Sequence, residues 1–519
     1  MNLNRYILGL GLLVSGSALT ACEKFLDVNS NPNNPVVSTP NFLLPGIISN
    51  GIQTQMFTSL RTPYLTQYVA SRTPNAAIDQ FGLANANSTN TFNYSYFQSG
   101  GNIPGMMKAA QDEGSPYYVG AGKIMQALLL AHATDMLGDI PYTEAYQGGA
   151  NFTPKYDSQE KIYATINQLC DEGAVEMAKP ASAEFRPFYS TSPSESGDIL
   201  YKGDPAKWRR LAYALKARQA QHLTKKGNYS ATAVLALCDQ AFTSSADDAQ
   251  INFQVAVAPL SNTTSIFGPT RGNFGGATYS ANIVKYLNGT TFPGVADPRF
   301  GVMIPTNSTG TDPGVGTSAT ANLTAGSTLT DFYGGWYARD LGYFEAITYH
   351  ELKFIEAEAA FRANNLPRAL AALREGIRAH MKKMSTGGTY SPPSVTFPFI
   401  TDGQINAYLA SAAVPQTEAA LTLRSIMEQK YIAMFLNPDS WSDMRRLDFD
   451  PAIYVNLQFP KYSGNTPPAS LAPGKYARRM LPGATEVAVN PNAVAALYAE
   501  AGATTNEDYV TKQLWFDRP

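Results

Sequence analysis

The residues best suited to ligand chemistry lie in a glycine-rich loop, residues 331–340, with the sequence DFYGGWYARD. This loop places Tyr333, Trp336 and Tyr337 beside charged side chains. Flat aromatic rings contact the C–H groups of a sugar, and a tyrosine combines an apolar face with a polar tip. Loops on a rigid scaffold often carry binding residues. Trp336 is therefore a candidate binding platform, and burial in a small satellite core is the alternative that the sequence leaves open.

Three further residues could contact a ligand from polar loops. Tyr94 and Tyr96 lie in a stretch rich in Asn and Ser, and Arg271 begins the run RGNFGG. Each lies in a loop rather than on a helical stripe, and loops carry function more often than the elements they connect. We therefore include these three side chains among the candidate ligand-binding residues.

The other three tryptophans of the chain are predicted to be structural. Trp208 falls on the apolar stripe of a helix, which favours burial in the core. Trp441 follows Pro438-Asp439 at the start of a helix and is expected in the core as well. Trp515, close to the C-terminus, is expected to dock the tail of the chain.

The sequence shows no pattern of a catalytic or metal site. The histidines are far apart and form no HExxH pair, and His350-Glu351 is predicted as a surface pair on a helix. Asp135 and Asp139 have the residue types of a glycosidase pair. They flank a helix end, however, where Asp139 would more simply accept hydrogen bonds from turn amides. The run after Arg271 lacks the lysine and serine of a phosphate-binding loop, and no EF-hand spacing supports calcium. We expect no catalytic residue, metal or cofactor.

These loops need a scaffold, and residues 121–145 indicate its kind. Between Ile124 and Met136 the apolar residues follow the i, i+3, i+4, i+7 spacing of a helix that buries one face. Gly138 can adopt the left-handed conformation that commonly ends a helix, and Pro141 prevents its continuation. The run GDIPY is therefore predicted to project from the helix as a stiff, shaped loop, although simple chain reversal would need the same residue types.

The clearest repeat unit covers residues 353–377, two helices joined at Asn364-Asn365. Ala357, Ala369, Leu373 and Gly376 lie at the spacing of a tetratricopeptide repeat, in which Ala357 and Ala369 would fill the small-residue positions where the paired helices approach closely. Other helix hairpins fit this single match about as well. Helix pairs are predicted at about residues 41–72, 121–178, 205–243, 346–383 and 418–446. The expected fold class is therefore all-α, with tetratricopeptide-like antiparallel helix pairs that form a superhelical scaffold.

Three long polar inserts interrupt this scaffold, at about residues 73–118, 243–341 and 454–492. They are rich in Gly, Ser, Thr, Asn or Pro, and unstructured stretches of such length in a compact domain are usually functional. We expect the inserts to pack together on one side of the scaffold and to carry the ligand side.

The N-terminus predicts a lipid-anchored, exported protein. Residues 1–21 contain Arg5 followed by an apolar run too short to span a bilayer. The run ends in LTAC, the pattern of a bacterial lipoprotein signal, and Cys22 would carry the acyl chains that anchor the protein. A secretory signal with a chance cysteine is the alternative. Residues 22–40 then form a polar tether, and residues 41–519 form the folded domain.

The composition excludes some classes of function. The net charge of −2 does not suggest nucleic-acid binding, and only 15% of the residues are charged, below the usual share of about 25%. The surface must therefore be rich in uncharged polar residues, as in secreted binding proteins. Cys170 and Cys238 both lie in helical patterns and are expected as buried free thiols, with a disulfide as the alternative in an oxidising compartment.

Several segments in a fixed order resemble the SusD/RagB family of outer-membrane lipoproteins that capture nutrients. The most specific is DMLGDIPYTEA at residues 135–145, which is similar to the GD-[IV]-PY motif of a SusD-like subgroup. Further matching segments are PKYDSQE at 154–160, GDPAKW at 203–208, FIEAEAA at 354–360, EQKYIA at 428–433, SWSDMRR at 440–446 and KQLWFD at 512–517. The loops on the ligand side show no residue-by-residue match to the starch-binding prototype of the family.

The resemblance implies an all-α, tetratricopeptide-like fold and a function without catalysis. It implies a partner, a SusC-like TonB-dependent β-barrel transporter, over which the protein acts as a hinged lid. The ligand would be a glycan or a peptide captured outside the cell. A tetratricopeptide-type adaptor at the outer membrane and a lipid-anchored polysaccharide hydrolase are the alternative functions.

Overall fold

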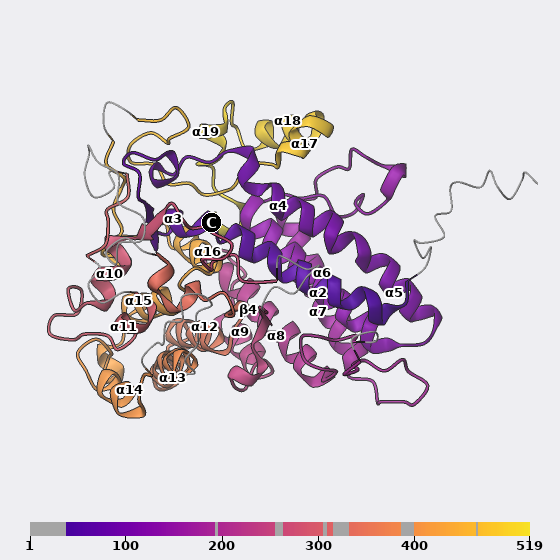
Figure 1. Cartoon of the computed structure of the whole chain (residues 1–519), viewed down its shortest axis with the longest axis horizontal. Helices are drawn as coiled ribbons and strands as arrows, with labels where there is room; N and C mark the ends of the chain where they lie inside the picture. The colour runs from indigo at the N-terminus through magenta and orange to yellow at the C-terminus, as the bar shows by residue number, and fades with distance from the viewer. Residues whose placement is uncertain are drawn as a thin grey trace, which may run out of the picture.

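The structure is a computed structural model that describes residues 38–192, 196–254, 263–304, 309–314, 332–385, 399–462 and 466–519. Helices dominate this part of the chain (Figure 1), which confirms the predicted all-α fold class. The larger helices are α2 (Pro40–Thr58), α5 (Ile103–Asp112), α6 (Pro116–Leu137), α7 (Gln159–Met177), α8 (Pro205–His222), α9 (Ala231–Cys238), α12 (Tyr349–Arg362), α13 (Leu366–Met384), α15 (Leu423–Ala433) and α16 (Asp439–Arg446). The others are α3 (Thr62–Leu65), α4 (Thr89–Phe92), α10 (Ala281–Leu287), α11 (Phe300–Met303), α14 (Asp402–Leu409), α17 (Ala484–Val489), α18 (Pro491–Glu500) and α19 (Asn506–Tyr509).

Helices α6 and α7 form the central pair, and α2, α5 and α8 pack against them (Figure 1). Two glycines let α6 and α7 approach closely. A Cβ atom on Gly173 would lie 2.6 Å from Cγ1 of Ile124, and one on Gly120 would lie 3.0 Å from the carbonyl oxygen of Gly173. Since these distances are shorter than van der Waals contact, any side chain at either position would push the pair apart.

From this pair the scaffold continues through neighbouring helices. Helix α8 packs against α7 and α9, α9 packs against α12, and α12 packs against α13 and α15. In the α12–α13 pair, Ala357 and Ala369 are fully buried, and a Cβ on Gly376 would lie 3.1 Å from the ring of Phe354. Ala357 and Ala369 therefore lie where the tetratricopeptide spacing predicts small residues, and Gly376 is a third close approach of the two helices.

Polar side chains fix where the scaffold helices begin. Ser158 accepts a hydrogen bond from the amide of Lys161 at the start of α7, and Asp204 accepts from the amides of Ala206 and Lys207 at the start of α8. Such side chains satisfy amides that have no partner within the helix. They explain why α7 begins at Gln159 and α8 at Pro205.

The GDIPY run leaves α6 at Gly138, which has φ of 92°. Ile140 then pairs with Asp157 in an antiparallel bridge. The Asp157 carboxylate accepts hydrogen bonds from the amides of Tyr142 at 3.0 Å and Thr143 at 2.7 Å. The loop after α6 is thus fastened to the segment that leads into α7.

Two small antiparallel sheets join segments that are far apart in the sequence. Strand β1 (Val69–Ser71) pairs with β3 (Ala277–Tyr279), and β2 (Ala249–Asn252) pairs with β4 (Tyr343–Ile347). Helix α2 packs against the β2–β4 sheet. This contact places the first helix of the scaffold beside the long central insert.

Several local features differ from the expectations drawn from sequence. His350 and Glu351 are 1% and 0% exposed, so the prediction of a surface pair is wrong. Glu351 is buried because it forms an ion pair with the buried Arg218. The predicted insert at 73–118 contains α4, α5, a π-helix at Asn93–Gln98 and the first turn of α6.

The two described cysteines agree with the expectation. Cys170 and Cys238 are buried free thiols.

Candidate ligand-binding site

A polar cavity of about 660 Å³ opens beside α2, a volume typical of sites for small ligands. We call it the α2 cavity. It lies between α2, the loop before α8, strand β2 and the segment near residue 271. Its lining includes Ser49, Gln53, Ile199, Lys202, Lys207, Asp248, Gln250, Asn252, Phe253, Gln254, Thr263 and Arg271. Amides, hydroxyls and cations therefore surround a space that also has apolar walls.

One face of α2 borders this cavity. Ser49, Gln53 and Phe57 follow each other at four-residue spacing, which places them on the same side of a helix. Gln53 donates a hydrogen bond to the Ser49 hydroxyl at 3.1 Å. One turn further, Tyr94 stacks on Phe57 with ring centroids 5.3 Å apart. The rim of the cavity thus continues into a pair of stacked rings.

Of the predicted ligand residues, Arg271 lines this cavity, and Tyr94 stacks on Phe57 one helical turn beyond Gln53. Arg271 lines the cavity and donates to the carbonyl oxygen of Thr264 at 3.4 Å. Burial raises the pKa of the half-buried Tyr94 phenol, and the positive charge of Arg271 opposes that rise. The two side chains are therefore close enough to interact electrostatically.

Trp336 lies elsewhere and is only 2% exposed. The guanidinium of Arg339 lies 3.7 Å from the centre of its ring, and Tyr343 packs edge-on against it. Its indole N–H has no hydrogen-bond partner among the residues that the structure describes. This burial favours the core alternative for Trp336, while its role as a binding platform stays a prediction.

The neighbours of Trp336 in the loop are partly buried. Tyr337 shares a hydrogen bond of 2.9 Å with Nε2 of His380, and burial raises its pKa well above the usual value. Tyr333 packs edge-on against Phe332. Neither tyrosine lines the α2 cavity.

Tyr96 supports the GDIPY loop. Its ring stacks between Phe92 and Tyr146, and its hydroxyl donates to the carbonyl oxygen of Pro141 at 2.8 Å. The structure assigns it contacts with the loop after α6 rather than with the α2 cavity.

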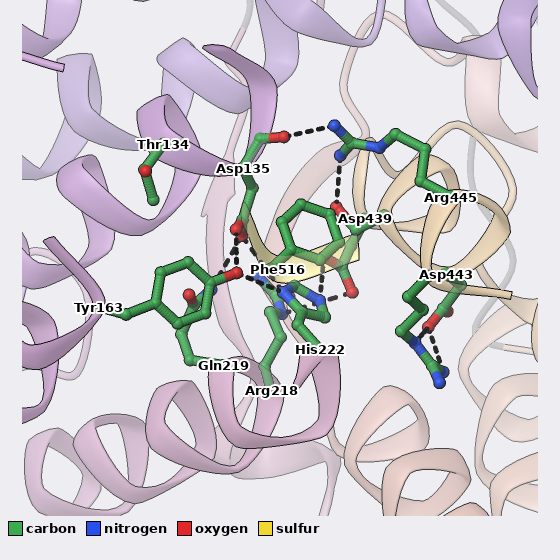
Figure 2. A network of polar contacts seen from close by, with 12 residues as sticks. Thr134, Asp135, Tyr163, Arg218, Gln219, His222, Asp439, Asp443, Arg445 and Phe516 are labelled. Atoms are coloured by element: carbon green, nitrogen blue, oxygen red, sulfur yellow. Dashed lines mark hydrogen bonds and ion pairs between the residues drawn. The ribbon is translucent and has the colours of Figure 1, made fainter. Parts of the chain in front are cut away.

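A second concentration of functional side chains lies inside the scaffold, around Asp135, His222 and Asp439 (Figure 2). Asp135 accepts hydrogen bonds from Tyr163 at 2.6 Å and Gln219 at 2.8 Å. The ring nitrogens of His222 lie 3.5 Å from Asp135 and 3.0 Å from Asp439. The three side chains come from α6, α8 and α16, so the network ties three distant parts of the chain together.

The charges of this network balance without a bound ion. Burial by itself lowers the pKa of His222, but the carboxylates of Asp439 and Asp135 outweigh it and raise the value to about 9. A doubly protonated imidazole therefore bridges the two carboxylates at neutral pH. The cationic Arg218 lies 3.9 Å from Asp439 as well. Since a metal ion needs a neutral imidazole and an anionic site, these residues fit a structural ion network better than a metal centre.

Arg445 connects the same network to the C-terminus. Its guanidinium donates to the carbonyl oxygen of Asp135 at 2.6 Å and lies over the rings of Trp441 and Phe516. Gln159 donates to the carbonyl oxygen of Thr134 and accepts from the amide of Phe516. Four of the segments that carry the SusD/RagB resemblance, at 135–145, 154–160, 440–446 and 512–517, therefore meet in one place.

This arrangement argues against the glycosidase alternative for Asp135 and Asp139. Asp135 is 3% exposed and fully engaged in the buried network. Asp139 accepts a hydrogen bond from the amide of Gln159 at 2.7 Å, which fastens α7 rather than the turn itself. A pair of catalytic carboxylates must face a substrate from both sides, and Asp135 has no access to one.

The sequence missed most of the α2 cavity. Gln53, Lys202 and Lys207 are polar residues in a helix, a loop and a first helical turn, and no local pattern distinguishes them from solvent-facing residues. Only Arg271 was predicted. The signal that could have found the others is the packing of α2 against the β2–β4 sheet, which no short-range pattern reveals.

The described residues thus form a scaffold of packed helices with a polar cavity beside α2, which defines a class of helical scaffold proteins. A family model described as "Starch-binding associating with outer membrane" matches residues 32–466, and the chain belongs to this SusD-like family. A search of curated proteins finds no match.

Solved structures share the fold. A chitin-binding SusD homologue from Flavobacterium johnsoniae is 20% identical, with a TM-score of 0.68 over 92% of this chain and 98% of that one. A SusD/RagB family protein from Bacteroides thetaiotaomicron is 22% identical, with a TM-score of 0.63 over 92% and 99%. A SusD homologue from Bacteroides fragilis is 18% identical, with a TM-score of 0.65 over 93% and 99%.

Proposed function

We propose that this protein is a non-catalytic, lipid-anchored receptor that captures a glycan at the cell surface and delivers it to a SusC-like TonB-dependent transporter. The observation that supports the proposal is the α2 cavity, which is lined by amides, hydroxyls and the ring of Phe253, with the stacked rings of Phe57 and Tyr94 one helical turn beyond Gln53. Such a combination of side chains binds sugars, because amides form hydrogen bonds with the sugar hydroxyl groups and aromatic rings contact the C–H faces of the sugar.

The comparisons favour a glycan over a peptide. The family description names starch, and the printed names of two similar structures name chitin. The particular glycan is a separate question, because structural likeness at this identity concerns the fold alone. Capture of a peptide remains the alternative to be tested.

The N-terminal segments support the proposed location. The predicted signal at 1–21 and the lipidated Cys22 lie outside the described residues, and the family description places its members at the outer membrane. Within the described part of the chain, none of the helices is both long and apolar enough to span a bilayer. We propose that residues 22–40 tether the SusD-like domain at 41–519 to the membrane.

Isothermal titration with product analysis tests the proposal. The lipidated full chain in detergent is titrated with chitin oligosaccharides, malto-oligosaccharides and short peptides, and each ligand is recovered and sized afterwards. We expect a glycan to bind and to be recovered intact. Binding only of peptides would contradict glycan capture, and a shortened glycan would support the hydrolase alternative.

The variant Gln53→Ala locates the binding event. Loss of one amide hydrogen bond should weaken glycan binding by about 1 kcal/mol, or roughly fivefold. The control Gln168→Ala makes the same change on the exposed face of α7 and should leave affinity unchanged. Equal affinities of all three proteins would place the glycan outside the α2 cavity.

Co-purification tests the partner. The tagged protein, extracted from its native membrane in mild detergent, should carry with it a large β-barrel protein. Recovery of soluble proteins alone would favour the adaptor alternative.

A further inference from the structure

One wall of the α2 cavity is a tight turn at residues 199–203, directly before α8. The residues of this turn that line the cavity are Ile199, Leu200, Tyr201 and Lys202. Tyr201 is buried, with its ring edge-on against Trp208 and its hydroxyl donating to the carbonyl oxygen of Asp247 at 2.9 Å. Lys202 is exposed, so the turn presents the side chain of this lysine to the cavity.

The backbone of Lys202 is in the left-handed conformation, with φ of 53°. Glycine adopts this conformation readily, whereas the Cβ atom of other residues makes it unfavourable. The next residue also has a positive φ, of 82°, and it is a glycine, Gly203. The turn therefore has glycine at one left-handed position and lysine at the other. Strained residues of this kind concentrate in ligand-binding sites, which indicates a function for the lysine side chain.

A buried carboxylate holds the turn in this conformation. Asp198 is 0% exposed. One of its oxygens accepts hydrogen bonds from the amides of Leu200 at 2.9 Å and Tyr201 at 3.1 Å. The other oxygen accepts from the Gly203 amide at 2.8 Å and from the Trp208 indole at 3.0 Å. These four hydrogen bonds fix the backbone on both sides of Lys202 and offset its unfavourable conformation.

The ammonium group of Lys202 is available to a ligand. It forms no ion pair or hydrogen bond with the residues that the structure describes. Lys207, which also lines the cavity, instead donates to the carbonyl oxygen of Ala246 at 2.7 Å. An ammonium group carries three N–H donors, and hydrogen bonds from a charged donor are about twice as strong as those between neutral groups. Lys202 is therefore suited to donate to the hydroxyl oxygens of a sugar.

We propose that Lys202 donates hydrogen bonds to the captured glycan and that Asp198 is the positioning residue that holds the lysine in place. This inference rests on the proposed glycan capture, because it assigns a ligand contact within the same cavity. The contact requires no charge on the glycan, since neutral hydroxyl oxygens accept hydrogen bonds. On this account the turn keeps its unfavourable backbone conformation for binding rather than for stability.

The variant Lys202→Gly separates binding from stability. The lipidated full chain is titrated with chitin and malto-oligosaccharides, and its melting temperature is measured. We expect Lys202→Gly to bind the glycan about tenfold more weakly, because a charged donor is lost. The melting temperature should not fall, because glycine adopts a positive φ readily. Lys202→Met, which keeps the Cβ atom and removes the ammonium group, should lose a similar factor in affinity.

Asn364→Gly is the matched control for the change to glycine. Asn364 is exposed, has φ of 56° and lies in the turn between α12 and α13, outside the cavity. This variant should bind the glycan as tightly as the unsubstituted protein. If Lys202→Gly and Lys202→Met also bind it that tightly, Lys202 does not contact the glycan and the assignment is overturned.

The variant Asp198→Asn tests the positioning role. An amide group replaces one accepting oxygen by an N–H donor, so two of the four donors lose their partner. We expect faster hydrogen exchange in a peptide that covers residues 199–207, and several-fold weaker glycan binding at a temperature where the variant is folded. Unchanged exchange or unchanged affinity would overturn the positioning role.

Asp79→Asn is the matched control for this change. Asp79 is also 0% exposed and accepts a hydrogen bond from the Ser71 amide at 2.9 Å, but it does not line the α2 cavity. This variant should keep the glycan affinity of the unsubstituted protein. An equal loss of affinity in Asp79→Asn and Asp198→Asn would show a general effect of destabilisation and would also overturn the positioning role.

The inference and the proposed function fail in different ways. Glycan binding that does not respond to changes at Lys202 and Asp198 would overturn the inference while glycan capture stands. If none of the oligosaccharides binds the unsubstituted protein, the proposed function itself is wrong, and the inference falls with it.

Discussion

At the scale of single residues, the environment of Trp336 decides its role. The ring is buried and lies under the Arg339 guanidinium. We predict that Trp336→Ala lowers the free energy of unfolding by about 3–5 kcal/mol, as large-to-small changes in a core do. Denaturant unfolding measures this loss, and titration measures the glycan affinity of the folded variant. Unchanged stability with weakened binding would restore the predicted binding platform.

Two buried histidines should respond to pH in opposite directions. Burial lowers the pKa of His132 to about 3, whereas at His222 two carboxylates outweigh burial and raise it to about 9. An unfolded histidine titrates near 6.5. The stabilisation from neutral His132 is therefore present above pH 6.5 and is lost as pH falls below it. The stabilisation from charged His222 is present below pH 6.5 and is lost as pH rises toward 9.

Unfolding of His132→Gln and His222→Gln across pH measures this contrast. Relative to the unsubstituted protein, the loss from His132→Gln should shrink as pH falls from 6.5 to 4.5. The loss from His222→Gln should shrink as pH rises from 6.5 to 9. Each change should amount to roughly 1.4 kcal/mol for every pKa unit titrated. Losses that do not vary with pH would contradict the assigned protonation states.

At the scale of elements, the close approach of α6 and α7 depends on glycine. Alanine is about 1 kcal/mol better than glycine inside a helix, yet a Cβ on Gly173 would lie 2.6 Å from Ile124. We predict that Gly173→Ala is destabilising by about 1–3 kcal/mol, as overpacking is.

Gly105→Ala is the matched control in α5, where a Cβ would meet nothing within 4 Å. It should stabilise the protein by up to about 1 kcal/mol. Thermal unfolding of both variants measures the difference. A stabilising Gly173→Ala would show that the helices separate more easily than their packing implies.

Local sequence was enough to predict elements whose signals are local. The apolar spacing between Ile124 and Met136 predicts a helix there, which is part of α6, and the turn at Asn364-Asn365 separates α12 from α13. The β2–β4 pairing was not predicted, because its strands are far apart in the chain and short. The α2 cavity depends on this sheet, so the sequence could name Arg271 but not Gln53 or Lys202.

At the scale of the whole molecule, the proposed membrane anchor should be separable from the scaffold. We predict that Cys22→Ala moves the protein from the membrane fraction to the soluble fraction, since acyl chains on that cysteine would provide the anchor. Fractionation with immunoblotting measures this change. The fold should be unaffected, because the described helices lie within residues 40–519. Retention in the membrane would contradict lipidation at Cys22.

The buried ion network joins parts of the chain that are far apart in the sequence. Asp135, His222 and Asp439 join α6, α8 and α16, and Arg445 adds the C-terminal tail (Figure 2). Breaking one partner of a buried ion network leaves charges without compensation. The segments that resemble the family therefore build the frame of the protein, while the α2 cavity is lined in part by residues 245–271 of the predicted central insert.

A crystal structure with the tightest-binding oligosaccharide tests the central claim most directly. We predict an intact sugar in the α2 cavity, within hydrogen-bond distance of Gln53 and Arg271 and beside the stacked rings of Phe57 and Tyr94. A sugar bound on another face, or one cleaved in the crystal, would contradict the account.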